Sequence, residues 1–416
     1  MLLGALAAMG AVSLDTYLPA LPQLTHDLGA SPAQTQLTVT TCMLGLALGQ
    51  LVAGPISDRT GRRGPLLIGL LIFTASSVLC ASAGSIELLI VWRLAQGLAG
   101  GASIVLSRAI VRDLFVGDTM VRVFASIMIV LGAGPILAPI VGAQLLAFTD
   151  WRGTFLALAG LSLILAAIAA FRMPETLPAS RRQRTRGAGV LAEFRVLATD
   201  YRFVLSSVGN ALTGAAMFVY LAASPFILQG IFGLSPQLFS VVFAVNATGF
   251  IAAGQANRPL LGRSTTSTRL LLGVAISLTG GLLLVTTLLL PTTPLPMVLT
   301  GFFTLTTGYG FASPNAVTLA MTGHQRRAGS ASALFGLAQY GIGTLVVPLG
   351  GLAGVSLTPA ACLIAGLTAV SLLTVAVLRH HLRKDANLRP PTPPNRQRSR
   401  PPPPVAPNSG LRQPHS

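Results

Sequence analysis

The sequence predicts an all-α integral membrane protein with about twelve transmembrane helices in two six-helix halves. Two observations predict this class. Of the 416 residues, 52% are hydrophobic and 9% are charged, with a mean hydropathy of +0.71, whereas about a quarter of the residues of a soluble protein are charged. The apolar residues also gather in long runs, and every second connection between these runs is basic. Most of the surface is therefore expected to face lipid.

Each helix that crosses a membrane needs about 20 predominantly apolar residues. We expect spanning segments at about 2–22, 36–57, 65–84, 86–108, 119–146, 153–172, 203–228, 236–257, 269–290, 296–318, 329–353 and 359–379. The strands of a membrane β-barrel would alternate apolar and polar residues over about ten positions. The runs here are longer and uniformly apolar, which excludes that class.

The first apolar run begins at Met1 and could be a secretory signal peptide. It lacks a basic amino-terminal region and a small-residue cleavage site, and Asp15 interrupts it. We therefore interpret it as the first spanning helix. Because no cytoplasmic leader precedes it, we expect the natural start of translation to lie upstream of Met1.

The basic residues predict the orientation of the chain, whose formal charge is +17. Arginines gather in every second connection, and the opposite connections carry almost none, with Arg152 as the exception. By the positive-inside rule, this pattern places both termini in the cytoplasm of a multi-pass protein of the bacterial inner membrane. No basic patch interleaves with aromatic residues on a soluble face, so we expect no nucleic-acid partner.

Polar segments divide the chain into four parts. We expect a first six-helix half at 1–172, a cytoplasmic loop at 173–202, a second half at 203–380 and a proline- and arginine-rich tail at 381–416. Two halves around a site at the membrane midplane are typical of carriers built from structural repeats. The tail is too polar to bury a core, which favours disorder with polyproline character.

Asp15 is the one acidic residue, of eleven, that lies well inside a predicted spanning helix. An ionised carboxylate at that depth costs roughly 3 kcal/mol or more, so it normally faces a cavity or a partner. Desolvation favours its neutral form and a nearby cation its ionised form. These properties suit a group that binds and releases a proton in each transport cycle. The structural alternative is a carboxylate that caps an unwound turn before Pro19 and Pro22.

Arg93 is the predicted partner of Asp15, because both residues lie about 10 Å below the same membrane boundary at 1.5 Å of rise per residue. Pairing would relieve both charges, and the guanidinium stays protonated throughout. The alternative is that Arg93 extends toward the interface or pairs with Glu87.

Other chemistry is not indicated. Cys42, Cys80 and Cys362 all lie in apolar runs without metal-ligand spacing, which favours ordinary packing and predicts no metal or cofactor. No catalytic cluster or P-loop motif occurs, so a membrane enzyme and an ATP-driven transporter are not supported.

Several segments resemble the major facilitator superfamily. The loop after the second predicted helix resembles the signature of the superfamily, which implies a cytoplasmic gate formed by Gly54, Asp58, Arg59, Gly61, Arg62 and Arg63. Arg93-Leu-Ala-Gln96-Gly97 is similar to its fourth-helix motif, which is associated with proton transfer. The fifth helix is similar to its antiporter motif at Gly134, Pro135, Pro139 and Gly142, although Ala138 and Ala143 stand where glycine is usual.

Within this superfamily, residues 5–380 resemble the bicyclomycin and chloramphenicol resistance branch, Bcr/CflA. The resemblance rests on Asp15-Thr-Tyr-Leu-Pro-Ala-Leu-Pro22, Leu48-Gly49-Gln50, Ala138-Pro139-Ile-Val-Gly142, Ala216-Met217-Phe218, Ser224-Pro225-Phe226 and Ala328-Gly329-Ser330-Ala331-Ser332. It implies proton-coupled export of small drugs. We expect a monomeric carrier in the lipid bilayer that exchanges protons for small hydrophobic or neutral antibiotics by alternating access.

Apolar, aromatic and neutral polar residues on the helices expected to line the cavity are the candidates for drug binding. They are Tyr17, Met43, Met217, Tyr220, Phe226, Phe243, Asn246, Asn315 and Gln339. The alternative function is a carrier of the same fold that exports an endogenous metabolite. A charged metabolite would need an opposite charge at the midplane of the second half, and the sequence shows none there.

Overall fold

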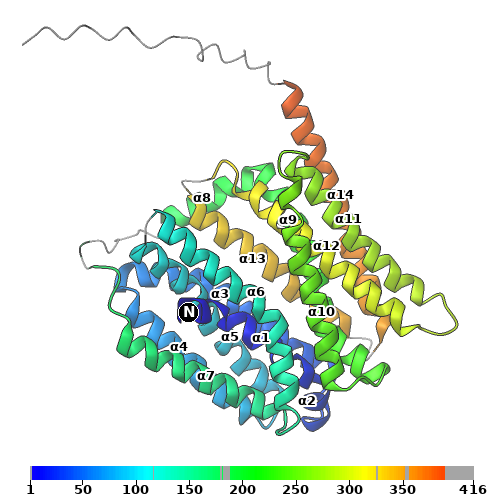
Figure 1. Ribbon diagram of the computed structural model, residues 1–416, viewed down its shortest axis with the longest axis horizontal. Helices are drawn as coiled ribbons and strands as arrows, with labels where there is room; N and C mark the ends of the chain where they lie inside the picture. The colour runs from blue at the N-terminus through cyan, green and yellow to red at the C-terminus, as the bar shows by residue number, and fades with distance from the viewer. Residues whose placement is uncertain are drawn as a thin grey trace, which may run out of the picture. The chain divides into compact units, whose positions relative to one another are not determined.

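The computed structural model describes residues 2–115, 117–178, 180, 188–324, 327–351 and 356–388, and every regular element within them is a helix (Figure 1). The contacts divide the chain into a unit of residues 1–379, which holds all the sites considered below, and a second unit of residues 380–416.

The first half of the larger unit contains six spanning segments, the first of which is broken into three pieces. Its elements are α1 (Leu2–Asp15), η1 (Leu18–Ala20), α2 (Leu21–Asp27), α3 (Pro32–Thr60), α4 (Arg63–Ala81), α5 (Ile86–Leu114), α6 (Gly117–Leu145) and α7 (Trp151–Arg172).

The second half begins after a short helix that belongs to the central loop, α8 (Ala188–Thr199). Its elements are α9 (Tyr201–Pro225), the π-helical turn η3 (Phe226–Ile231), α10 (Pro236–Gln255), η4 (Arg258–Leu260), α11 (Thr266–Thr287), α12 (Leu295–Met321), α13 (Ala328–Val346), η6 (Val347–Gly351) and α14 (Leu357–Leu388).

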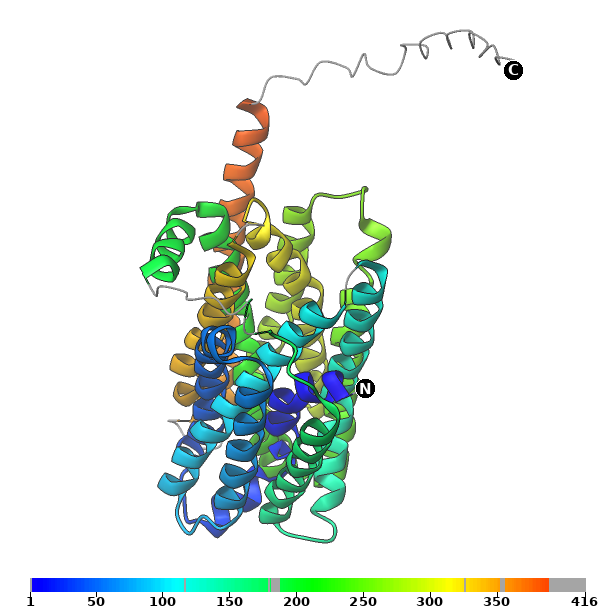
Figure 2. The same cartoon turned by 90° about the vertical axis from the view of Figure 1, so that its left-hand side faces the viewer.

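The two halves repeat one packing pattern. In the first half α1 packs against α5 and α6, and α3 packs against α5; in the second half α9 packs against α12 and α13, and α10 packs against α12. These are the same pairs by order in each half. Between the halves, α6 contacts α10 and α3 contacts α13 (Figures 1 and 2). The predicted arrangement of two six-helix repeats is therefore present.

Within the described residues, ten helical segments are long and apolar enough to cross a membrane. Of the other two predicted spans, α6 is 29 and α12 is 27 residues long, which exceeds the length that a spanning helix needs. Only Ile129–Leu145 of α6 counts as an apolar stretch. The fold is thus a membrane bundle of about twelve helices, as the sequence predicts.

Glycines bring α3 and α5 into backbone contact. A Cβ atom on Gly97 or Gly101 would overlap the carbonyl oxygens of Cys42 and Leu46, and one on Gly45 or Gly49 would overlap carbonyl oxygens of α5. Small residues allow helices in lipid to approach this closely. This contact fixes α5, and with it Arg93, against α3.

Two segments are more helical than the sequence predicts. The central loop at 173–202 contains α8, whose Leu197 is fully buried. The predicted tail at 381–416 begins within α14, which continues to Leu388 because the first residue that cannot extend a helix is Pro390. Residues 389–416 lie outside the described part of the chain.

Candidate functional site

A break in the first spanning segment positions Asp15. The helix α1 ends at Asp15, and the chain resumes as a 3-10 turn only at Leu18, because Pro19 has no N–H to continue the α-helical pattern. The Asp15 side chain is buried, with 6% exposure, and makes no hydrogen bond or ion pair with any described residue. The turn η1 that follows it contacts α9 and α10 of the second half. Asp15 is therefore a buried carboxylate at the boundary between the halves.

Arg93 on α5 is fully buried beside this break and has no acidic partner among the described residues. Its guanidinium donates to the carbonyl oxygens of Ser13 at 3.1 Å and Thr38 at 3.4 Å, and to Oε1 of Gln96 at 2.5 Å. It also lies 4.2 Å from the ring centroid of Tyr17, within cation–π range. Oxygen dipoles and a ring face thus stabilise the cation.

The predicted ion pair between Asp15 and Arg93 is not formed in this structure. The depth argument agrees with the geometry, since Arg93 bonds to Ser13, two residues before Asp15. The two groups nevertheless do not meet: the Arg93 guanidinium donates to the carbonyl oxygen of Ser13, and the Asp15 carboxylate bonds to no described residue. Depth along a helix does not fix the direction in which a side chain points.

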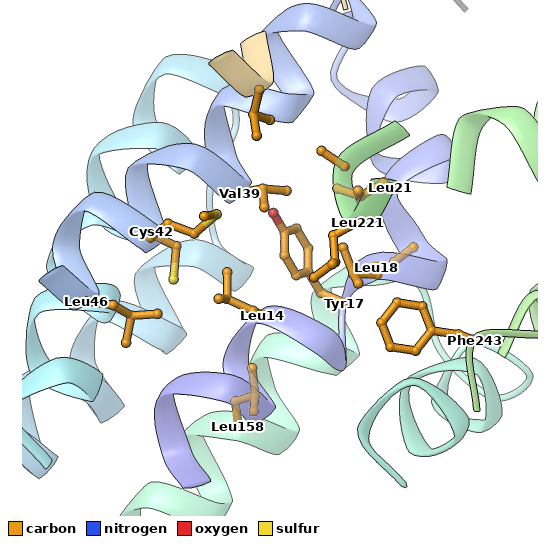
Figure 3. Close-up of a cluster of buried hydrophobic side chains, with 14 of the residues drawn as sticks. Leu14, Tyr17, Leu18, Leu21, Val39, Cys42, Leu46, Leu158, Leu221 and Phe243 are labelled. Atoms are coloured by element: carbon orange, nitrogen blue, oxygen red, sulfur yellow. The ribbon is translucent and has the colours of Figure 1, made fainter. Parts of the chain in front are cut away.

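The predicted drug-binding residues fall into two groups, of which the first surrounds Tyr220. Asn246 donates to the Tyr220 hydroxyl at 2.8 Å, and the Tyr220 ring stacks on Phe243 at 6.0 Å between centroids. Figure 3 shows Phe243 beside Leu18 and Tyr17 of the broken segment. This group is a buried aromatic cluster of the second half, in which Tyr220, Phe243 and Asn246 are each at most 4% exposed.

The other predicted residues are more dispersed. Tyr17 packs in the core with its hydroxyl 2.8 Å from Thr38, and Asn315 bonds to Asn257 within the second half, so both side chains are engaged in packing. The remaining residues lie in other positions: Met43 near Gly343, Met217 half-buried, Gln339 bonded to Tyr309 and Phe226 in a surface pocket of 380 Å³ with Pro22, Thr25, His26, Gly29, Ala30 and Gly230.

The predicted gate is an ion network centred on Arg62. Its guanidinium pairs with Asp58 at 2.6 Å and with Asp113, at the end of α5, at 2.9 Å, and it donates to Ser57. Gly61 adopts a φ of 101°, which favours glycine, where α3 ends and the chain turns toward Arg62. All described partners of the Arg62 guanidinium lie in the first half.

Glu175 stabilises the same turn between α3 and α4 by accepting backbone N–H groups of the turn. Its carboxylate accepts the backbone N–H groups of Arg62 at 2.8 Å and Arg63 at 3.3 Å, and Arg63 donates to the carbonyl oxygen of Ala170. Burial raises the pKa of Glu175, but these N–H donors outweigh burial, so its pKa lies below the ordinary value. Sequence reasoning missed Asp113 and Glu175, which resemble ordinary loop charges.

The predicted antiporter motif on α6 packs against the broken segment. A Cβ atom on Gly142 would overlap the carbonyl oxygen of Thr16, the residue after Asp15. Gly134 has open space around it, and Pro135 and Pro139 lie inside the helix. Only one end of the motif therefore makes a contact that requires glycine.

Comparison with known proteins agrees with the fold of two six-helix halves. The family profile of the Major Facilitator Superfamily matches residues 1–348. The chain belongs to the major facilitator superfamily. It is a multi-pass membrane transporter, and this superfamily comprises carriers rather than enzymes.

Members of the superfamily with similar sequences include an uncharacterized MFS-type transporter, YdgK, of Bacillus subtilis, which is 35% identical over 84% of this chain and 88% of its own length. The bicyclomycin resistance protein homolog of Haemophilus influenzae is 27% identical over 93% of this chain and 96% of its own length. The multidrug resistance protein MdtL of Salmonella heidelberg is 28% identical over 85% of this chain and 87% of its own length.

Solved structures share the fold at low identity. The nucleoside transporter NupG aligns with a TM-score of 0.73 and 15% identity over 91% of this chain and 98% of its own. A bacterial homolog of the lysosomal transporter Spinster, in an inward-facing and occupied conformation, aligns with a TM-score of 0.67 and 13% identity over 93% of this chain and 96% of its own.

Proposed function

We propose that this transporter exports small hydrophobic or neutral antibiotics in exchange for protons. The observation that carries the proposal is Asp15, a buried carboxylate without a described partner at a break in the first spanning segment. Intramembrane ionisable groups of this kind commonly belong to ion or substrate pathways.

Proton exchange follows from the position of Asp15 between two environments. While the carboxylate is buried, desolvation favours its protonated form; when the halves separate and water enters, the ionised form is favoured. The turn η1 directly after Asp15 contacts α9 and α10 of the second half. A change of charge on Asp15 therefore alters the interaction between the halves, which is the coupling that an antiporter needs.

Drug binding is assigned to the buried cluster of Tyr220, Phe243 and Asn246. Stacked aromatic rings with one amide resemble the usual composition of a small-molecule site, which is mostly apolar with few polar groups. The names of the relatives support drugs as the substrates, since two of them are described as bicyclomycin resistance and multidrug resistance proteins.

We further propose that both termini lie in the cytoplasm of a bacterial inner membrane and that the carrier acts as a monomer. The alternation of arginines between connections supports the orientation. Reporter fusions in the 173–202 loop and after residue 380 check it: activity of a cytoplasmic reporter is expected at both positions, and periplasmic activity at either contradicts the proposed orientation.

Purified protein in liposomes tests the function. We expect an imposed proton gradient to drive uptake of chloramphenicol or bicyclomycin, and addition of the drug without a gradient to move protons in the opposite direction. Liposomes without protein are the control. A drug flux whose rate does not depend on the proton gradient would contradict antiport. The absence of flux for a panel of antibiotics would favour a metabolite exporter.

A further inference from the structure

Arg269, in the first turn of α11, is a buried cation that the proposed mechanism does not use. Its side chain is 6% exposed, and neither Nε nor Nη1 has a hydrogen-bond partner within the described residues. Its Nη2 atom donates to the Thr266 hydroxyl at 3.2 Å, so the guanidinium lies beside the first residue of the helix. A buried cation with free donors is unfavourable unless an acceptor binds to them.

The start of α11 offers further donors at the same place. A helix leaves its first N–H groups without partners inside the helix. Thr265 caps α11 by accepting the N–H group of Thr268 at 3.2 Å, whereas the N–H groups of Thr266 and Ser267 bond to no described residue. Such groups, together with the positive end of the helix dipole, attract anions. Arg269 and the start of its own helix therefore present donors to one anion.

The first half holds a carboxylate at the corresponding position. There α4, the third spanning segment, begins at Arg63, and Glu175 after α7 accepts the N–H groups of Arg62 and Arg63. The third spanning segment of the second half is α11. Between residues 201 and 384 the sequence contains no aspartate or glutamate, although it contains nine arginine and lysine residues. This stretch therefore provides no carboxylate to take the place of Glu175.

Free donors from a buried cation and from a helix start favour an oxyanion from outside the chain. Phosphate has several acceptor oxygens, and it binds both to helix N-termini and to guanidinium groups. We propose that Arg269, the Thr266 hydroxyl and the N–H groups of Thr266 and Ser267 bind a phosphate group. Two sources supply this chemistry, the headgroup of an anionic phospholipid and free inorganic phosphate. With the proposed orientation the site lies at the cytoplasmic face, where basic pockets bind lipid headgroups.

This inference goes beyond drug export, because it concerns the start of α11 rather than Asp15. The lipid arm measures equilibrium binding of dioctanoyl phosphatidylglycerol to the purified full-length protein in detergent. Dioctanoylglycerol, which has the same acyl chains without the phosphate, is the matched probe. The phosphate arm measures binding of inorganic phosphate, with chloride at equal ionic strength as its control.

Four proteins are compared in each arm: the wild type, Arg269→Gln, Thr266→Pro and Arg258→Gln. Arg258→Gln is the matched control, since it removes the same charge from an exposed position in the same connection. Proline suits the first position of a helix, so Thr266→Pro should keep the helix start while it removes one N–H group and the hydroxyl.

We expect the wild type to bind phosphatidylglycerol about tenfold more tightly than dioctanoylglycerol, as hydrogen bonds to a charged group imply. Arg269→Gln should remove this preference and leave dioctanoylglycerol binding unchanged. Thr266→Pro should reduce the preference about threefold or more. Arg258→Gln should retain it. If Arg269→Gln does not fold, the preference of Thr266→Pro decides.

The two arms distinguish the sources of the phosphate. Preference for phosphatidylglycerol without binding of inorganic phosphate identifies a lipid headgroup, and binding of inorganic phosphate that Arg269→Gln abolishes shows that the phosphate group alone is sufficient. Equal binding of the two lipids together with no binding of inorganic phosphate would overturn the site. Unchanged phosphate binding in Arg269→Gln, or an equal loss in Arg258→Gln, would also overturn it.

Discussion

Arg93 stabilises the broken segment by binding backbone and amide oxygens rather than an acid. Its guanidinium contacts the end of α1 through Ser13, α3 through Thr38 and α5 through Gln96. Gln96 extends the network by donating to Ser77 of α4. One planar group with five donors can satisfy acceptors from several helices at once. Arg93 thus positions the turn that carries Asp15.

We predict that Arg93→Lys destabilises the protein, because a compact ammonium cannot reach all three acceptors. The loss of hydrogen bonds to a charged group should lower the free energy of unfolding by about 2–3 kcal/mol. Chemical denaturation of the purified protein measures the free energy of unfolding. A variant as stable as the wild type would show that these contacts do not stabilise the helices.

At the predicted gate, we expect Asp113→Asn to impair transport about as strongly as Asp58→Asn. Both carboxylates pair with Arg62, and each pair is partly buried. Losing a hydrogen bond to a charged group changes the balance between states by about 1.5–3 kcal/mol. Transport rates at matched amounts of protein in the membrane check this. Glu87→Gln, at an exposed position, is the control, and wild-type transport by Asp113→Asn would show that the Arg62–Asp113 pair has no gating role.

The depth of individual charges could be predicted from the sequence, but their partners could not. The isolation of Asp15 among apolar residues indicated its burial, which the structure confirms. The partners of Arg93 are mainly carbonyl oxygens, which every residue carries and which no motif distinguishes.

At the scale of elements, the important feature is the contact between α6 and the break after Asp15. Gly142 lies against the carbonyl oxygen of Thr16, so the fifth span supports the non-helical turn of the first. Non-helical backbone inside a membrane is tolerated where protein surrounds it. The prolines at 19 and 22 indicated an unwound turn, but its contact with Gly142 required the structure.

We predict that Gly142→Ala reduces transport strongly and lowers stability, because the new methyl group would overlap the Thr16 carbonyl oxygen. Forcing atoms into a packed contact typically costs about 1–3 kcal/mol. Gly134→Ala in the same motif is the matched control, since nothing lies within 4 Å of the new methyl group. Equal effects of the two substitutions on thermal stability and transport would show that the motif does not act through this contact.

The spanning helices could be predicted from the sequence, because a long apolar run in lipid can satisfy its backbone groups only as a helix or a closed barrel. The short helix α8 in the central loop could not be predicted in this way. Tertiary contacts hold the helix α8 in place. Glu193 within α8 accepts a hydrogen bond from Ser330 of α13, and Asp200, the residue directly after α8, pairs with His324. Such contacts leave no periodic signal in a polar loop.

At the scale of the whole carrier, hydrogen bonds join the halves at the end that contains α2 and η3. The side chains of Gln36, Gln229 and Gln237 donate to the carbonyl oxygens of Ala222, Pro19 and Ala143 in the opposite half. With the proposed orientation, this is the outer end. The structure is therefore expected to represent a state that is closed to the outside.

We predict that cross-linking this end stops transport, because alternating access requires these contacts to separate. Pro19→Cys and Gln229→Cys, joined by a short bifunctional thiol reagent, should reduce drug export to the background of empty vesicles. A reducible reagent should restore export after reduction. The single substitutions control for Cys42, Cys80 and Cys362, of which only Cys362 is exposed. Full transport by the cross-linked protein would mean that this end does not open.

The central claim, that Asp15 carries the transported proton, is tested most directly by drug-driven proton flux in liposomes that contain Asp15→Asn. Asparagine keeps the shape and hydrogen-bonding capacity of the side chain but cannot titrate. We expect drug-driven proton movement and drug accumulation to fall to the level of protein-free liposomes while drug binding persists. Asp27→Asn, at the end of α2, should behave as the wild type. Proton movement against drug at the wild-type rate in Asp15→Asn would contradict the mechanism.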